Sequence, residues 1–282
     1  MPFVVSLEEA KACYPEYTFL AALTPSVQKA AFHVRDANGQ DLCLKIISPD
    51  YDMDRLKREI LALQSICHPN VASFKEYTFS SRPSWQRHHI IEEFIPGDDL
   101  ALLLEPGQTW PRTRVASFFA ALCDGLDALG KKGIVHRDLK PSNVRVRPDD
   151  SPVIIDLGLA RHLTLTDITR TSDGAAIGTP LYFAPEQFRG TKHDIDHRTD
   201  LFAVGIMIYQ ALVGQHPFWK PGMEGPLSDA VCTSEDHLAA EGFVALPRQW
   251  CLIVGKTLEK ERANRPAAAG QVATILRKIG EA

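Results

Sequence analysis

The chain has 282 residues, of which 45% are apolar and 23% are charged. This balance is typical of a globular protein and excludes a largely disordered chain. The formal net charge is −4, so there is no overall basic field to attract nucleic acid or an anionic membrane, and neither is expected as a partner.

The cysteines and the first residues indicate a cytoplasmic protein. The six cysteines contain no CxxC pair and lie mostly in apolar stretches, as reduced core cysteines do. A secretory signal would carry basic and then apolar residues near Met1, whereas this chain has the acidic residues Glu8 and Glu9 there. The longest apolar stretch, residues 201–213, has 13 residues, whereas a membrane span needs roughly 20. We therefore expect a buried helix there and no membrane segment.

The first third of the chain is predicted to be rich in β-strands. Runs typical of strands cover residues 17–23, 30–35, 41–48, 71–79 and 88–95. The Asn38-Gly39 pair between the second and third runs is a hairpin signal. From residue 54 to residue 67, apolar residues recur at steps of four, three and three, which is the period of a helix with one buried face.

Beyond Pro96-Gly97, which marks a break, the pattern becomes helical. The longest helical candidates are residues 112–131, 201–213, 246–259 and 267–279. A small β-rich part followed by a larger helical part predicts an α+β fold of two lobes, with a cleft between them and a hinge near residues 93–97. We assign residues 1–95 to the first lobe and 96–282 to the second, together forming one domain.

The segment His136-Arg137-Asp138-Leu139-Lys140-Pro141-Ser142-Asn143 carries the clearest chemical signal. Phosphoryl transfer needs a carboxylate to orient the attacking hydroxyl, a cation to balance the phosphate charge and an oxygen ligand for magnesium. Asp138, Lys140 and Asn143 supply one of each within six residues. A charged surface loop with the same residue types is the alternative, and the next motif argues against it.

A second motif follows the apolar run at residues 153–155, where Asp156 precedes Leu157 and Gly158. A carboxylate at the end of a buried strand, followed by a flexible Gly, can meet a metal that bridges phosphates. Together the two motifs resemble the catalytic loop and the magnesium-binding motif of eukaryotic-like (Hanks-type) Ser/Thr protein kinases. The resemblance implies a two-lobed kinase fold, ATP as phosphate donor, and Mg²⁺ or Mn²⁺ held by Asn143 and Asp156. Leu157 replaces the family's Phe, which leaves the metal role of Asp156 untouched.

The resemblance extends to three residues that support the fold. Residues 178–186 read Gly-Thr-Pro-Leu-Tyr-Phe-Ala-Pro-Glu and resemble the end of a Ser/Thr kinase activation segment. This likeness implies an ion pair between Glu186 and the late Arg265. Asp200 resembles the family's Asp that holds the catalytic loop from below. We expect structural rather than chemical roles for all three.

Lys45 is a lone lysine inside a predicted apolar strand. By the same resemblance it pairs with Glu59, fourteen residues on, and contacts the α- and β-phosphates of ATP. Counting back from the break at residue 97 places Glu93 at the hinge beside the nucleotide. Glu92 then falls at the gatekeeper position, or Ile91 does if the register shifts by one residue.

The nucleotide loop is the main departure from the family pattern. In place of GxGxxG the chain reads Thr24-Pro25-Ser26-Val27-Gln28-Lys29, with no glycine. Side chains impede the close approach of backbone N–H groups to phosphates, and Pro25 has no N–H. Three interpretations are open. The loop holds ATP more weakly, with Lys29 or the Thr24 and Ser26 hydroxyls compensating; it closes only with a partner; or nucleotide binding is lost.

Arg137 suggests control by phosphorylation, because in the family an Arg at this place receives an activation-loop phosphate. A polar loop follows Asp156, and we expect autophosphorylation within residues 164–172. The regulatory candidates there are Thr164, Thr166, Thr169, Thr171 and Ser172. A plain flexible loop would have the same composition.

The residues therefore favour a Ser/Thr kinase that transfers the γ-phosphate of ATP to a protein hydroxyl. Lys140 and Thr179 resemble Ser/Thr kinases rather than tyrosine kinases, and residues 178–186 argue against a small-molecule phosphotransferase. Two alternatives stay open because of the loop without glycine. One is a pseudokinase scaffold that binds nucleotide weakly or not at all, and the other is a kinase-fold nucleotidyl transferase.

Overall fold

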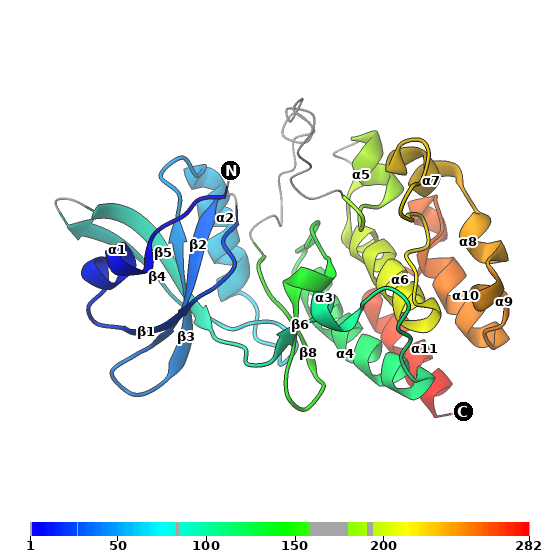
Figure 1. Ribbon diagram of the computed structural model, residues 1–282, viewed down its shortest axis with the longest axis horizontal. Helices are drawn as coiled ribbons and strands as arrows, with labels where there is room; N and C mark the ends of the chain where they lie inside the picture. The colour runs from blue at the N-terminus through cyan, green and yellow to red at the C-terminus, as the bar shows by residue number, and fades with distance from the viewer. Residues whose placement is uncertain (1, 27, 83–84, 158–179, 191–193, 282) are drawn as a thin grey trace. The chain divides into compact units, whose positions relative to one another are not determined.

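The computed structural model describes residues 2–26, 28–82, 85–157, 180–190 and 194–281. The chain forms two compact units, Met1–Ile95 and Pro96–Ala282, which are taken in turn below (Figure 1).

Unit 1 is built on a five-stranded antiparallel sheet with the strand order β1-β2-β3-β5-β4. The strands are β1 (Thr18–Ala22), β2 (Lys29–Arg35), β3 (Asp41–Ile47), β4 (Phe74–Arg82) and β5 (Trp85–Glu93). The predicted hairpin joins β2 to β3. Gly39 in this turn has φ +81°, a conformation that favours glycine, and the Asp36 carboxylate accepts the N–H groups of Asn38 and Gln40.

The helix predicted after β3 is present as α2 (Met53–Gln64). Leu56, Ile60 and Leu63 from its apolar stripe are buried. The helix ends before His68-Pro69, close to the predicted boundary.

A further helix, α1 (Leu7–Cys13), was not predicted. It begins with a capping box, in which Ser6 Oγ accepts the Glu9 N–H at 3.2 Å and the Glu9 carboxylate accepts the Ser6 N–H at 3.0 Å. Ala10 and Tyr14 from this segment join the same apolar cluster as Leu44 on β3. The first residues of the chain therefore complete the core of unit 1.

Unit 2 is mainly helical, with a small antiparallel sheet of strand order β6-β7-β8. The strands are β6 (Asp98–Asp99), β7 (Val144–Val146) and β8 (Pro152–Ile154). The helices are α3 (Leu100–Leu103), α4 (Arg112–Lys131), α5 (Pro185–Arg189), α6 (His197–Val213), α7 (Leu227–Thr233), α8 (Asp236–Ala239), α9 (Glu241–Val244), α10 (Arg248–Thr257) and α11 (Ala269–Gly280).

Helix α6 is the centre of unit 2 and is buried on nearly every face, as its apolar sequence predicts. It packs against α4 and α10, and α11 lies along α4 (Figure 1). The approach of α10 requires a small residue on α6. A Cβ at Gly205 would lie 2.5 Å from Thr257 Oγ1 on α10 and 2.9 Å from Leu258 Cδ2.

The expected α+β fold, with a β-rich first part and a mainly helical second part, is confirmed. No helix in the described part of the chain is both long and apolar enough to cross a membrane.

Candidate active site

Three of the predicted site residues meet in the loop between α4 and β7. Lys140 Nζ donates to Asp138 Oδ2 at 2.8 Å. Asn143 Nδ2 donates to the Asp138 backbone carbonyl at 2.7 Å and lies 3.2 Å from Asp138 Oδ2. The short 3-10 helix Pro141–Asn143 brings Asn143 back to Asp138. The cation and the amide are thus both held within hydrogen-bond reach of one carboxylate, that of Asp138.

Backbone contacts join Asp156 to this loop. The N–H of the preceding residue, Ile155, donates to the Asn143 carbonyl at 3.0 Å. The His136 ring Nε2 hydrogen bonds to the Ile155 carbonyl at 3.2 Å. Asp156 itself has φ +60°, a left-handed conformation that is uncommon for a residue with a side chain. Such a conformation persists only where the surrounding structure enforces it, as the two contacts of Ile155 do here.

The donor set at this place fits a hard divalent cation. Asn143 is 8% exposed and supplies an amide oxygen, and Asp156 supplies a carboxylate. Oxygen ligands of this kind are those that Mg²⁺ prefers, with phosphate oxygens and water completing its shell. Across the described residues no group of three or more His, Cys, Asp or Glu could hold a metal on its own.

Asp200, near the start of α6, holds the catalytic loop through its backbone. Its carboxylate oxygens accept the N–H of His136 at 2.8 Å and the N–H of Arg137 at 2.9 Å. Burial raises the pKa of Asp200, and these two N–H groups oppose that rise. Arg137 adopts φ +66°, a second left-handed residue in the loop. The position expected of Asp200 from the sequence is the one observed.

Gln187 is a site residue that the sequence analysis missed. Its Nε2 donates to the Arg137 carbonyl at 2.7 Å, and its Oε1 accepts the Ala184 N–H at 3.0 Å. It therefore ties the first turn of α5 to the catalytic loop. A neutral residue one position after Glu186 gives no charge signal, but its place in the first turn of a helix is a usual one for a capping Gln.

The expected ion pair between Glu186 and Arg265 is present. Two N–H groups of the Arg265 guanidinium reach the two carboxylate oxygens at 2.7 and 2.8 Å. The side chains are 0% and 5% exposed for Arg265 and Glu186. Thr199 Oγ1 donates a further hydrogen bond to Glu186 at 2.8 Å. This buried pair anchors α5 against the segment that follows α10.

Two stacked rings, Phe202 and Phe218, each lie close to a cation. The Arg265 guanidinium lies 4.8 Å from the Phe202 ring centre, and Phe202 stacks on Phe218 at 5.7 Å. Lys260 Nζ lies 4.0 Å from the centre of the Phe218 ring. Nζ is buried and has no hydrogen-bond partner among the described residues. Burial lowers the pKa of Lys260 to about 8.

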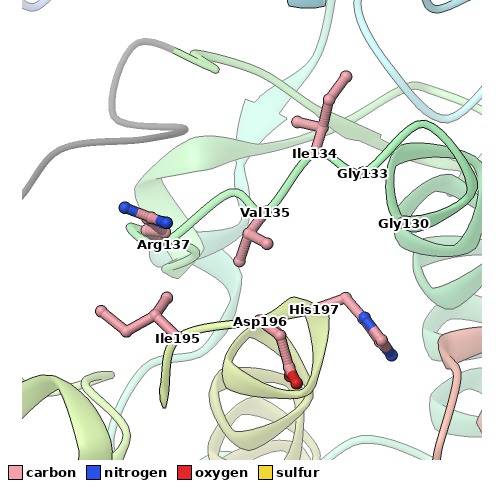
Figure 2. A pocket seen from close by; sticks show the side chains of 8 residues that line it. All are labelled: Gly130, Gly133, Ile134, Val135, Arg137, Ile195, Asp196 and His197. Atoms are coloured by element: carbon pink, nitrogen blue, oxygen red, sulfur yellow. The ribbon is translucent and has the colours of Figure 1, made fainter. Parts of the chain in front are cut away.

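A pocket adjoins the catalytic loop at the end of α4 and the start of α6. Figure 2 shows Val135 and Arg137 from the loop on one wall and Ile195, Asp196 and His197 on the other. Asp196 caps α6, and its carboxylate is already bonded to the side chain of Arg198. Asp138 is not one of the residues that line this pocket.

In unit 1, Lys45 on β3 is buried and paired with a carboxylate from the sheet. Its Nζ lies 2.7 Å from Glu92 Oε2 on β5. Glu59, the expected partner, is carried by α2, but its side chain lies outside the described residues. The register pairs Cys43 with Glu92 and Leu44 with Ile91. Because faces alternate along a strand, Glu92 rather than Ile91 shares the face of Lys45.

The loop between β1 and β2 is closed by its own hydrogen bonds. Ser26 Oγ accepts the N–H groups of Gln28 at 3.3 Å and Lys29 at 3.0 Å. The Ser26 carbonyl accepts the Phe3 N–H at 3.0 Å, which links the loop to the start of the chain. Lys29 is 5% exposed, with Nζ 5.9 Å from the Tyr51 ring centre. Of the proposed phosphate contacts, Thr24 and Ser26 are exposed and Lys29 is buried.

The remaining candidates divide between one residue that is described and a group that is not. The Glu93 carboxylate accepts the Ser73 N–H at 3.3 Å, and the Glu93 N–H donates to the Ser73 carbonyl at 2.8 Å. Residues 158–179 lie outside the described residues, and the candidates that fall there are Gly158, Thr164, Thr166, Thr169, Thr171, Ser172 and Thr179.

Comparison with known proteins gives a family for this fold and site. Residues 27–274 match the family described as protein kinase domain. The chain is 31% identical over 249 residues to serine/threonine-protein kinase pkn2 of Myxococcus xanthus, a match that covers 84% of this chain and 29% of pkn2. It is 27% identical over 252 residues to a probable serine/threonine-protein kinase PknB of Bifidobacterium longum, covering 84% of this chain and 35% of that protein.

The chain belongs to the protein kinase domain family, as its catalytic-loop motif predicted. A third relative, serine/threonine-protein kinase pkn3 of Myxococcus xanthus, is 31% identical over 242 residues, which are 79% of this chain and 41% of pkn3. The chain therefore spans about a third of the length of these relatives.

Proposed function

We propose that this chain is a Ser/Thr protein kinase domain that transfers the γ-phosphate of ATP to a protein hydroxyl, with Mg²⁺ or Mn²⁺ as cofactor. The observation that carries the proposal is the contact of Asp138 with both Lys140 and Asn143. The names of the relatives, which are Ser/Thr protein kinases, support the choice of acceptor.

The side chains divide the work of an in-line transfer. Asp138 orients the acceptor hydroxyl and takes its proton as the new O–P bond forms and the bond to the leaving ADP oxygen breaks. Lys140, held 2.8 Å from Asp138, balances negative charge on the transferred phosphoryl group. Asn143 and Asp156 would hold the metal, whose charge offsets that of the phosphates. Lys45 would contact the α- and β-phosphates.

One assay tests this function against the two alternatives. The protein is incubated with γ-labelled and α-labelled ATP in parallel, together with the Asp138→Ala and Asp156→Ala variants. Label from the γ position alone, lost in both variants, is the expected result. Label from the α position would show a nucleotidyl transferase. No label, with no thermal shift on adding nucleotide, would show a scaffold. Of the two alternatives the scaffold is favoured over the transferase, because Ser26 Oγ already accepts N–H groups of its own loop.

Autophosphorylation between residues 164 and 172 is part of the proposal, with Arg137 as the phosphate receptor. Mass spectrometry of the purified protein after incubation with ATP and magnesium should find phosphate there. Full activity towards another substrate with no phosphate in that segment would contradict it.

A cytoplasmic location is proposed from the cysteines. All six lie in the described part of the chain, and no disulfide forms among them. Reduced thiols are usual in the cytosol. Formation of disulfides in the protein isolated from its native cells under alkylating conditions would argue against this location.

A further inference from the structure

The pairing of Lys45 with Glu92 brings together two side chains that the sequence places 47 residues apart. In the antiparallel pair of β3 and β5, Lys45 lies opposite Ile90 and Glu92 lies opposite Cys43. The two residues are therefore diagonal neighbours on one face of the sheet, within reach of long side chains. The ion pair is supported by two strands that hydrogen bond to each other directly.

Both side chains of this ion pair are buried. The side chains are 9% and 3% exposed for Lys45 and Glu92, so water screens this ion pair little. The second oxygen of the carboxylate, Glu92 Oε1, is buried and has no hydrogen-bond partner among the described residues. Burying a carboxylate oxygen without a hydrogen bond costs free energy. The bond from the other oxygen to Lys45 is the feature of Glu92 that can explain why this cost is tolerated.

We propose that Glu92 is a positioning residue, which holds the Lys45 ammonium from within the sheet so that it can meet the nucleotide phosphates. The inference rests on the proposed function, in which Lys45 contacts those phosphates. An ammonium has three N–H donors, so it can keep its bond to Glu92 while another donor meets a phosphate oxygen. The family resemblance assigned this task to Glu59 on α2. Glu92 gives Lys45 a partner on the neighbouring strand of the same sheet.

The first test is kinetic and compares Glu92→Gln with Glu59→Gln. Glutamine keeps the size of the side chain and removes the charge. Glu92→Gln weakens a hydrogen bond between charged groups. From the usual strength of such a bond, we expect kcat/KM for ATP to fall by about tenfold to a hundredfold. The KM for the peptide substrate should stay within about twofold, since a general loss of structure would change both constants. Glu92→Asp, which keeps the carboxylate, should fall between the wild type and Glu92→Gln.

Glu76→Gln on β4 is the matched control, because it removes an exposed carboxylate from the same sheet. We expect its constants to equal those of the wild type. The proposal is overturned if Glu92→Gln keeps more than half of the wild-type kcat/KM, or if Glu59→Gln costs more than Glu92→Gln.

The second test needs no enzyme activity. Lys45 is treated with a small acylating reagent in the absence of nucleotide, and its labelling rate is followed by peptide mass spectrometry. The Lys45 ammonium is buried and bonded to the Glu92 carboxylate. Labelling should therefore be at least about threefold faster in Glu92→Gln, which weakens that bond, and unchanged in Glu76→Gln. Equal rates overturn the inference even in an active kinase. Faster labelling in a protein that transfers no γ-phosphate upholds the pair and refutes the proposed function instead.

A third comparison covers the case in which Glu92→Gln fails to fold. Lys45→Met leaves the Glu92 carboxylate buried and alone, and should melt below the wild type. Adding Glu92→Leu removes that charge, so the double variant should melt above Lys45→Met. A double variant that melts no higher than Lys45→Met shows that the two charges are not coupled and overturns the proposal.

Discussion

Arg265→Met should be among the most destabilising substitutions in unit 2. It removes the two N–H groups that bind the Glu186 carboxylate at 2.7 and 2.8 Å and leaves that carboxylate only 5% exposed. Breaking a buried ion pair from one side costs about 3 to 5 kcal/mol, because an uncompensated charge stays behind. For a fold stabilised by about 5 to 15 kcal/mol, this is a fifth or more of the total.

Urea unfolding followed by circular dichroism measures this loss, and two further variants separate its causes. Thr199→Val removes one hydrogen bond to Glu186 while Arg265 stays in place, so a loss of only about 1 kcal/mol is expected. Adding Glu186→Leu to Arg265→Met removes the stranded charge and should recover part of the loss. The reasoning is refuted if Arg265→Met unfolds within about 1 kcal/mol of the wild type, or if the double variant is no more stable than Arg265→Met.

Three other substitutions test separate parts of unit 2. The two carboxylate oxygens of Asp200 each accept one backbone N–H group, whereas the Asn side chain in Asp200→Asn has a single acceptor oxygen. It should lower kcat by about tenfold or more, and an unchanged kcat would contradict the holding role. For Lys260, the folded pKa of about 8 lies below the ordinary lysine value of 10.5, so the unfolded chain binds more protons between these pH values. The unfolding free energy should rise with pH across that window, and Lys260→Met should lack this rise when both proteins are denatured in urea at each pH. In Gly205→Ala the new Cβ would lie 2.5 Å from Thr257 Oγ1, so the unfolding free energy measured in urea should fall by about 1 to 3 kcal/mol. In the control Gly255→Ala nothing lies within 4 Å of the new Cβ, and no loss of stability is expected.

The catalytic loop was predictable because its chemistry is local in sequence. Asp138, Lys140 and Asn143 lie within six residues, and short-range spacing is enough to bring them together. Helix α4 was predicted at its observed bounds, Arg112–Lys131, because it is long and strongly patterned. The strands of unit 1 were found from their β-type composition, with ends that differ by a few residues.

Features that depend on long-range pairing were not predictable in the same way. The contact of Lys45 with Glu92 depends on the register of two strands, which no spacing within the chain reveals. Helix α1 has only seven residues, too few to show an apolar period. Its one local signal was the Ser6 to Glu9 capping pattern. Gln187 was missed because an uncharged residue does not stand out beside Glu186.

The segment ahead of β2 has a practical consequence for anyone who shortens this protein. The family match begins at residue 27, yet Ala10, Tyr14 and Phe19 belong to the buried cluster of unit 1. A chain cut at that boundary would lose β1, turn β2 into an unprotected edge strand and uncover Phe32 to water. Bare edges and apolar faces promote aggregation. The smallest soluble piece of this kinase domain should therefore keep the residues from Phe3 onwards.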